Sequence, residues 1–361
     1  MKVWKSKARR REQAQVIAHL TAVSNGRKTQ THAGETGSEP SSTFKTDEGP
    51  LIVGEEATTF GSEPWWTHKN WNKLPVSQEM TGLVVHNGVM GDLAIAGSTY
   101  RGRRHQLRGA PNDDSFRITS VSDQQGTNPW LIAVVSDGVG SAQYSSIGSA
   151  VAAENTAALL AHSLRNQAEL SAHDYASRVQ QQITPFLARL SESMSQQLHT
   201  NKPQWIATMG YSPPATAELS DLQATLTAVA VRATPDTDGT FSGVLISIGD
   251  SPAFILNDAH YQPIQKANDD NDLHTTSTEG VFGATTAEVT SFTLDPAGVL
   301  LLATDGLANF LTHGGTTTTL GAQIAERWAE PIDAVGMARD ISFDLSSADD
   351  DRTAIAIWPR A

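Results

Sequence analysis

The sequence of 361 residues contains no cysteine, and this absence removes several classes of protein at once. Disulfide-stapled scaffolds, thiolate zinc sites, iron–sulfur clusters and enzymes with a cysteine nucleophile all need that side chain. Long apolar runs are missing too. No stretch approaches the roughly 18 to 20 consecutive apolar residues that cross a bilayer, so we expect no membrane-spanning helix.

Positive charge is the scarcer sign, since 26 Lys and Arg stand against 39 Asp and Glu and leave a net charge of −13. A chain this acidic is poorly suited to holding a nucleic-acid backbone over a broad surface, so we expect no nucleic-acid partner. The same excess suits a site that gathers divalent cations, which prefer carboxylate oxygens. We further expect a cytoplasmic monomer.

The first 81 residues differ in composition from the rest of the chain. Basic residues crowd between Lys2 and Arg11, and polar residues break the following stretch, which in a signal peptide would be uninterrupted and apolar. We expect a solvated, partly helical tail over residues 1–24, or else a contact with an anionic partner or membrane surface. Residues 25–81 are rich in Thr, Ser, Gly, Glu and Pro, end in a Trp-rich segment, and are typical of a disordered linker. A folded domain is then expected over residues 82–361.

Within this domain, groups of short β-type runs alternate with helical stretches. Strands are predicted at 93–99, 115–121, 130–136, 224–233, 241–248, 253–257, 289–294, 299–304 and 353–358, and helices at 145–168, 171–199, 320–329 and 332–344. Pro185 is expected to kink the second helix or to begin a new one. Asp250 is expected in a hairpin between two strands. Because a pair of helices separates two groups of strands, the order favours an α+β fold with antiparallel sheets.

Four acidic clusters each adjoin a predicted strand. They lie at Asn112 to Ser115, Ser136 to Ser141, Thr304 to Leu307, and Asp349 to Thr353. A single aspartate at a strand end is ordinarily a turn residue or a helix N-cap. If the sheets bring these four ends together, however, three or four carboxylates converge, and like charges that close are unfavourable unless cations neutralise them. Oxygen-only ligands indicate Mg²⁺ or Mn²⁺ rather than zinc.

The order of six short motifs resembles a known family. The motifs are Asn-Asp-Asp-Ser at 112–115, Ser-Asp-Gly-Val-Gly-Ser at 136–141, Leu-Gln-Ala-Thr-Leu-Thr at 222–227, Ile-Gly-Asp-Ser at 248–251, Ala-Thr-Asp-Gly-Leu at 303–307 and Asp-Asp-Arg-Thr-Ala at 350–354. Together they resemble the metal-dependent Ser/Thr protein phosphatases (PPM, or protein phosphatase 2C). They are most similar to a divergent bacterial branch with a His…Gly-x-Pro-Asn-x-Asp segment, here His105 to Asp114. The resemblance covers about residues 92–358 and implies an αββα sandwich, in which helices flank two facing antiparallel β-sheets.

The resemblance implies a dinuclear metal site at one edge of that sandwich, with roles for individual residues. Asp137 matches the aspartate that bridges both metal ions, and Gly138 matches the residue whose backbone carbonyl contacts one of them. Asp305 and Asp350 match the two aspartates that complete the other ion's shell. Asp114 matches an acid that holds metal-bound waters.

Further assignments depart from the family pattern. Asp113 stands where many members have a glutamate, and its side chain is one methylene shorter. Asp221 lies near an acid that the family associates with a third, weaker metal ion. Many members also place an arginine before the acidic pair to grip the substrate phosphate. That position is not an arginine here, so Arg108 or Arg104 is the candidate. His105 is either a general acid towards the leaving alkoxide or a structural histidine at a strand end.

The activity that the resemblance implies is hydrolysis of phosphoserine or phosphothreonine in proteins. Two ions, Mn²⁺ or Mg²⁺, would activate a bridging water for direct attack on phosphorus. The partners would be phosphorylated proteins, the products of an opposing Ser/Thr kinase. Two hypotheses remain beside it: a catalytically weak phosphatase-like module that binds phosphoproteins or regulates, and a metal-dependent phosphohydrolase for small molecules. The retained aspartates argue against the first, and the lack of a nucleotide- or sugar-binding motif argues against the second.

Overall fold

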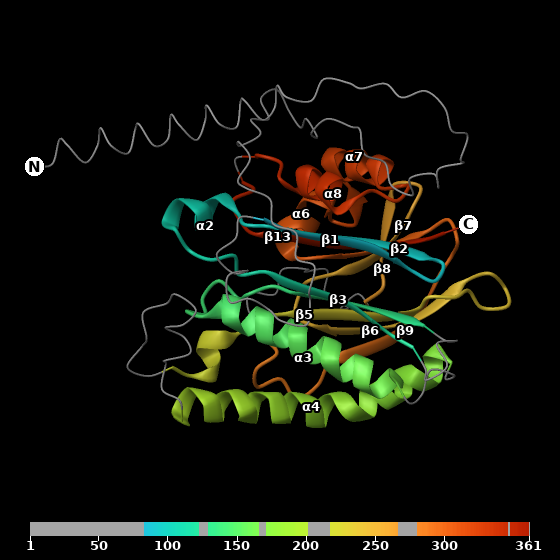
Figure 1. Ribbon diagram of the computed structural model, residues 1–361. Helices are drawn as coiled ribbons and strands as arrows, with labels where there is room; N and C mark the ends of the chain where they lie inside the picture. Colours follow the sequence, from blue (N-terminus) through green and yellow to red (C-terminus); the bar gives the residue numbers. More distant parts are fainter. Residues whose placement is uncertain are drawn as a thin grey trace, which may run out of the picture. The chain divides into compact units, whose positions relative to one another are not determined.

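The computed structural model describes residues 83–122, 129–165, 171–200, 217–265, 280–345 and 347–360. The tail and the linker predicted over residues 1–81 lie outside these ranges. The described elements form two antiparallel sheets, one above the other in Figure 1, with helices on the outer face of each.

The larger sheet has six strands in the order β1-β2-β13-β10-β7-β8. These strands are β1 (Leu83–Met90), β2 (Leu93–Tyr100), β7 (Ala253–Asn257), β8 (His260–Pro263), β10 (Val299–Ala303) and β13 (Arg352–Pro359). The smaller sheet has the order β3-β4-β5-β6-β9, formed by β3 (Ser115–Val121), β4 (Trp130–Ser136), β5 (Leu226–Arg232), β6 (Phe241–Ile248) and β9 (Glu288–Leu294). A short ribbon pairs β11 (Thr312–His313) with β12 (Thr316–Thr317).

Two sets of helices cover the sheets (Figure 1). The long helices α3 (Ser145–Arg165) and α4 (Ala172–Thr200) lie on the five-stranded sheet, and α6 (Asp305–Leu311), α7 (Thr319–Arg327) and α8 (Ala334–Ile341) lie on the six-stranded sheet. The short helix α2 (Arg103–Arg108) follows β2, and a 3₁₀ helix, η2 (Leu219–Leu222), precedes β5.

Strand β4 shows why the layers stack in this way. A strand sends alternate side chains to opposite sides, and in β4 the side chains of both faces are buried. Leu131, Ala133 and Val135 pack against the other sheet, whereas Ile132 and Val134 pack against the helices α3 and α4. A continuous apolar run therefore places β4 between two hydrophobic layers, and the α+β sandwich predicted from the sequence is confirmed.

Three points refine or correct the local expectations. Of the two alternatives at Pro185, the structure excludes a new helix, since α4 continues through the proline with Ile183 and Leu187 buried on either side of it. Asp250 does not lie in a hairpin: β6 belongs to the five-stranded sheet and β7 to the six-stranded sheet, so its segment crosses between the sheets. The helices α2 and α6 were not anticipated, since both are short and α6 contains Gly306, a poor helix former.

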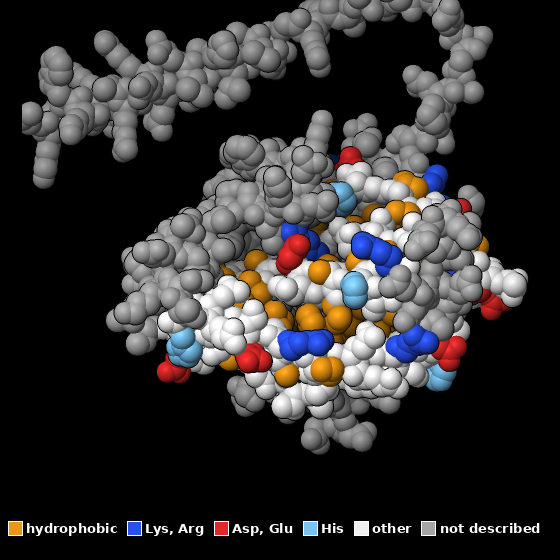
Figure 2. Space-filling view, turned by 60° about the horizontal axis from the view of Figure 1, so that its bottom comes forward, with side chains coloured by type: hydrophobic (Ala, Val, Ile, Leu, Met, Phe, Trp, Pro, Cys, Tyr) orange, Lys and Arg blue, Asp and Glu red, His pale blue; other side chains and the backbone are white. Residues whose placement is uncertain are grey.

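The outer face of α4 is polar. Figure 2 brings this side of the molecule forward and shows acidic and basic side chains scattered among uncharged ones, without a gathering of one sign on the visible face. Within the described ranges, no helix combines the length and the apolar character needed to span a bilayer.

Candidate functional site

Strand register brings the acidic clusters to one edge of the sandwich. In the five-stranded sheet, the start of β3 pairs with the end of β4 through Ser115 and Ser136. Asp114 directly precedes Ser115 and Asp137 directly follows Ser136, so the two acids lie at the same edge. In the six-stranded sheet, the end of β10 pairs with the start of β13. The sheets are joined at this edge because the hydroxyl of Thr304 donates to Asp114 Oδ2 over 2.8 Å. Segments nearly 200 residues apart in sequence thus meet at Asp114.

Asp137 lies at the electrostatic centre of this group. Its backbone N–H donates to Thr225 Oγ1 over 3.0 Å, which fixes the residue at the end of β4. Desolvation raises the pKa of the Asp137 carboxyl well above its usual value, and the charges of Asp114, Asp305 and Asp350 raise it further. Four carboxyl groups predicted as metal-site residues are therefore close enough to affect one another.

The pKa values of the surrounding acids shift in the same direction. Desolvation and the charge of Asp351 raise the pKa of buried Asp114 well above its usual value. Desolvation raises the pKa of Asp113 to about 6, although His105 opposes the change. The pKa of Asp350 is also raised by desolvation. Holding these groups ionised together needs positive charge from outside the cluster.

Close backbone approach explains the glycine after Asp137. The Gly138 N–H donates to the Asp113 carbonyl oxygen over 3.1 Å, and a Cβ atom on Gly138 would lie 2.8 Å from that oxygen. Any larger residue would push apart the ends of β3 and β4. Gly138 also forms a bridge with Ala224, which anchors it to the segment entering β5.

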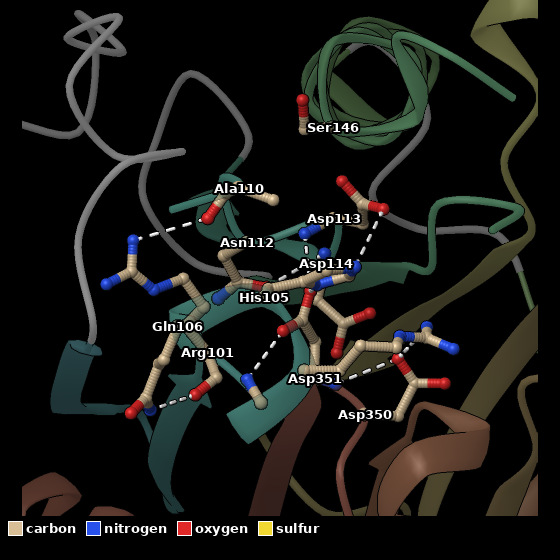
Figure 3. Close-up of polar contacts among 12 residues, drawn as sticks. Arg101, His105, Gln106, Ala110, Asn112, Asp113, Asp114, Ser146, Asp350 and Asp351 are labelled. Atoms are coloured by element: carbon tan, nitrogen blue, oxygen red, sulfur yellow. Dashed lines mark hydrogen bonds and ion pairs between the residues drawn. The ribbon is translucent and has the colours of Figure 1, made fainter. Parts of the chain in front are cut away.

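Asp351 connects the two acidic loops with α2, and the sequence did not reveal this role (Figure 3). It is almost fully buried and accepts three hydrogen bonds: from Gly102 N over 2.6 Å, from His105 Nδ1 over 2.8 Å and from Asp113 N over 2.5 Å. The other ring nitrogen of His105 lies 3.6 Å from Asp113 Oδ2. The hydrogen bond to Asp351 is the main cause that raises the pKa of His105.

The two arginine candidates lie in different surroundings. The guanidinium of Arg104 is 2.8 Å from Asp350 Oδ1 and is only about one-third exposed. Arg108 ends α2 on the exposed surface. Although both residues are on the same short helix, the structure brings Arg104 to the acidic group and directs Arg108 to solvent.

Asp221 is engaged elsewhere. Its carboxylate accepts a hydrogen bond from Glu218 N over 2.9 Å and closes a capping box at the start of η2. Its backbone carbonyl accepts from Tyr144 N over 2.7 Å. These contacts give Asp221 a structural role next to α3, and its assignment to a third metal ion stays a prediction.

The donor set fits hard divalent cations. Asp114 Oδ1 is buried and has no hydrogen-bond partner within the described ranges, which is costly unless a cation or water meets it. The nearby donors are carboxylate oxygens, as Mg²⁺ and Mn²⁺ prefer. Across the part of the chain that the structure describes, no three or more His, Asp or Glu side chains already surround a single point as a finished metal centre. The fit therefore rests on the donors' chemistry and unneutralised charge.

A comparison with protein-family models matches residues 101–342 to the model described as Protein phosphatase 2C. The match covers more than half of the chain and contains α2, the acidic pair before β3, Asp137 and Asp305. The chain belongs to the protein phosphatase 2C family. The family resemblance of the motifs is thereby confirmed. No curated protein matches the chain.

Solved structures of bacterial phosphatases are similar at low identity. The PPM Ser-Thr phosphatase MsPP from Mycobacterium smegmatis, in complex with cacodylate, is 16% identical with a TM-score of 0.47, over 74% of this chain and 99% of that one. The catalytic domain of PstP, in complex with two manganese ions, is 15% identical with a TM-score of 0.45, over 74% and 99%. PppA of Pseudomonas aeruginosa, described as a regulatory component of T6SS, is 17% identical with a TM-score of 0.45, over 75% and 98%.

Three residues of the site, Asp351, Thr304 and Thr353, went unassigned in the sequence, although all lie within the short motifs that carried the family resemblance. Asp351 sits in a run of three aspartates, and nothing in the run tells which carboxylate faces the core. Thr304 and Thr353 flank predicted ligands, but threonine at a strand end is common. Their full burial, found only in the fold, is what marks them.

Proposed function

We propose that this protein is a metal-dependent protein Ser/Thr phosphatase that works with two Mn²⁺ or Mg²⁺ ions. The observation that carries the proposal is the group formed by Asp114, Asp137, Asp305 and Asp350, whose charges act on one another at a single edge of a 2C-family sandwich. Its substrates would be proteins carrying phosphoserine or phosphothreonine, the products of a Ser/Thr kinase.

Each acidic residue has a proposed task. Asp137, the Gly138 carbonyl, Asp305 and Asp350 would hold the ions, while Asp113 and Asp114 would hold water around them. When bound, two such ions supply an acidified water for attack on phosphorus and positive charge for the phosphoryl oxygens. The chain's own contribution is to hold several carboxylates close together at a buried edge of the sandwich, where their ionised forms are unfavourable unless cations neutralise them.

Arg104 is the side chain we assign to substrate phosphate. Its guanidinium already faces the acidic group through Asp350, and arginine binds phosphate oxygens through two parallel N–H bonds. The pair is partly exposed, so an incoming phosphate can compete with Asp350 for the same N–H groups.

His105 is better suited to orienting Asp113 than to protonating a leaving group. It is only 7% exposed, and both ring nitrogens face carboxylates, those of Asp351 and Asp113. A general acid matters most for phosphothreonine, whose alkoxide leaves poorly, and little for p-nitrophenyl phosphate. His105→Asn should therefore lower both rates by a similar factor. If His105→Asn lowered the rate only for the phosphothreonine peptide, His105 would instead be assigned as the general acid.

The proposed function is tested by assaying the purified protein on p-nitrophenyl phosphate and a phosphothreonine peptide. We expect turnover of both with Mn²⁺ or Mg²⁺, and none above background with chelator. Equal rates with chelator present would contradict the proposal. Binding of Mn²⁺ and of the phosphopeptide without turnover would favour the phosphoprotein-binding module instead.

A further inference from the structure

A buried ring of hydrogen bonds surrounds Asp114. Its backbone N–H donates to Asn112 Oδ1 over 2.9 Å, and Asn112 Nδ2 donates to Thr99 Oγ1 over 2.8 Å. The Thr99 and Thr353 hydroxyl oxygens lie 2.7 Å apart, and Thr353 Oγ1 lies 2.8 Å from Asp114 Oδ2. Since a hydroxyl has one proton and a carboxylate only accepts, Thr353 donates to Asp114 and accepts from Thr99. The ring closes on the residue where it began.

Thr304 adds a second hydroxyl to the same carboxylate oxygen. It is the N-cap residue of α6, yet its side chain makes no capping hydrogen bond to that helix. It donates to Asp114 Oδ2 over 2.8 Å and accepts from Thr353 N over 2.9 Å. A helix N-cap usually satisfies its own helix, so this threonine serves Asp114 at the expense of α6.

The two hydroxyls divide the carboxylate into two unequal oxygens. Oδ2 accepts from Thr304 and Thr353, whereas Oδ1 is buried without a partner in the described part of the chain. Both threonines are fully buried. Thr353 lies in β13 of the six-stranded sheet and Thr304 directly follows β10 of the same sheet, while Asp114 leads into the five-stranded sheet. Rotation of the carboxylate would break two hydrogen bonds at once, so Oδ1 is held in one direction.

We propose that Thr304 and Thr353 form a hydroxyl clamp that aims Asp114 Oδ1 at the divalent-cation site. The inference rests on the proposed function, and it adds two positioning residues to that site. The clamp saturates one oxygen and leaves the other to the coordination shell of a cation. It also ties the metal site to the interface between the sheets, so that cation affinity depends on uncharged groups that touch no ion.

The test measures Mn²⁺ affinity by titration calorimetry on the full chain, independently of catalysis. Thr353→Val keeps size and backbone but removes the hydroxyl, and we expect Mn²⁺ binding about tenfold weaker, the scale of lost outer-shell partners. Thr353→Ser, which retains the hydroxyl, should stay within about threefold of the wild type. Thr304→Ser and Thr304→Val should behave in parallel. Thr156→Val is the matched control, because Thr156 is fully buried in α3 and its hydroxyl has no described partner.

A double-mutant comparison separates positioning from general damage. If the clamp acts through Asp114 alone, adding Thr353→Val to Asp114→Asn should not weaken Mn²⁺ binding any further. Unchanged affinity in Thr353→Val, or an equal loss with and without Asp114→Asn, would overturn the proposal. So would a wild-type protein that binds no Mn²⁺. A protein that binds Mn²⁺ as expected but hydrolyses no phosphoester would refute the proposed function and leave the clamp standing.

Discussion

Two buried carboxylates in this molecule, those of Asp340 and Asp114, have neighbouring charges of opposite sign. Asp340, on α8, is 1% exposed and is met by one positive and one neutral donor: Arg327 Nη2 lies 2.8 Å from Oδ1, and Trp328 Nε1 donates to Oδ2 over 2.9 Å. Asp114 is 5% exposed and is met by threonine hydroxyls and by the charges of neighbouring acids. Burial raises the pKa of both carboxyls, and hydrogen-bond donors oppose the rise at both. The neighbouring charges differ: those of Arg327 and Arg339 lower the pKa of Asp340, whereas those of Asp351 and Asp350 raise the pKa of Asp114 further.

The difference separates an acid that the chain pairs internally from one that we propose for the metal site. A buried charge that the chain itself neutralises needs nothing more and contributes to the packing of α7 against α8. A group of buried acids that the chain neutralises only in part, here through Arg104 and His105, needs further positive charge from solution to stay ionised.

Replacing Asp137 by asparagine should lower activity, whereas the same replacement at Asp340 should lower stability. Asp137→Asn removes the charge at the centre of the acidic group, and we expect metal-dependent turnover to fall roughly 100-fold or more. Asp340→Asn leaves Arg327 facing a neutral partner, so the free energy of unfolding should fall by about 3 kcal/mol. Phosphatase assays and urea denaturation of both variants check this. If Asp340→Asn lost activity while folded, or Asp137→Asn kept it, the contrast would fail.

Without metal, the acidic group should make the protein less stable as the pH rises. The pKa of Asp113 is about 6 in the folded protein against 3.8 ordinarily, so the folded state binds more protons between these values. Stability is then greatest below pH 3.8 for this group and is lost as the pH rises through 6. Asp113→Asn should therefore stabilise the chelator-treated protein at pH 7 by roughly 2 to 3 kcal/mol, and not at pH 4. Denaturation at the two pH values measures this, and a pH-independent difference would refute it.

The guanidinium of Arg104 is a positive group that the chain places beside Asp350. Its removal should weaken substrate binding more than it lowers the stability of the fold. We expect Arg104→Ala to raise KM for the phosphothreonine peptide about tenfold, since one charged hydrogen-bond partner of phosphate is lost. Arg108→Ala, on the exposed end of the same helix, is the matched control and should leave KM within about twofold. Steady-state kinetics at saturating Mn²⁺ decide between them. A larger effect of Arg108 would return the phosphate-binding role to that residue.

Much of the fold could be predicted because most of its strands coincide with local runs of apolar residues. The runs at 130–136 and 241–248 match β4 and β6 residue for residue. Elements with little apolar periodicity were not predicted from the sequence. Helix α2 has six residues with one buried side chain, and α6 begins with Asp-Gly. The segment around Asp250 was misplaced because a hairpin and a crossover between sheets have the same local sequence signals.

The site was predictable as a list of acids but not as an arrangement. Asp137 and Asp305 could be named because each follows an apolar strand and precedes glycine. Asp351 could not be distinguished from Asp349 and Asp350, since only the loop before β13 decides which carboxylate turns inward to Gly102 and His105. Arg104 and Arg108 were interchangeable for the same reason, until the start of α2 set their directions.

The amino-acid sequence alone determined the kind of chemistry available here. The absence of cysteine excludes thiolate ligands, and the aspartates at strand ends favour oxygen donors, because ligand type belongs to the residue itself. Tertiary structure decided which of those oxygens meet. Hydrogen bonds between distant segments, such as those from Thr304 and Thr353 to Asp114, depend on two sheets packing face to face, and no local pattern encodes that distance.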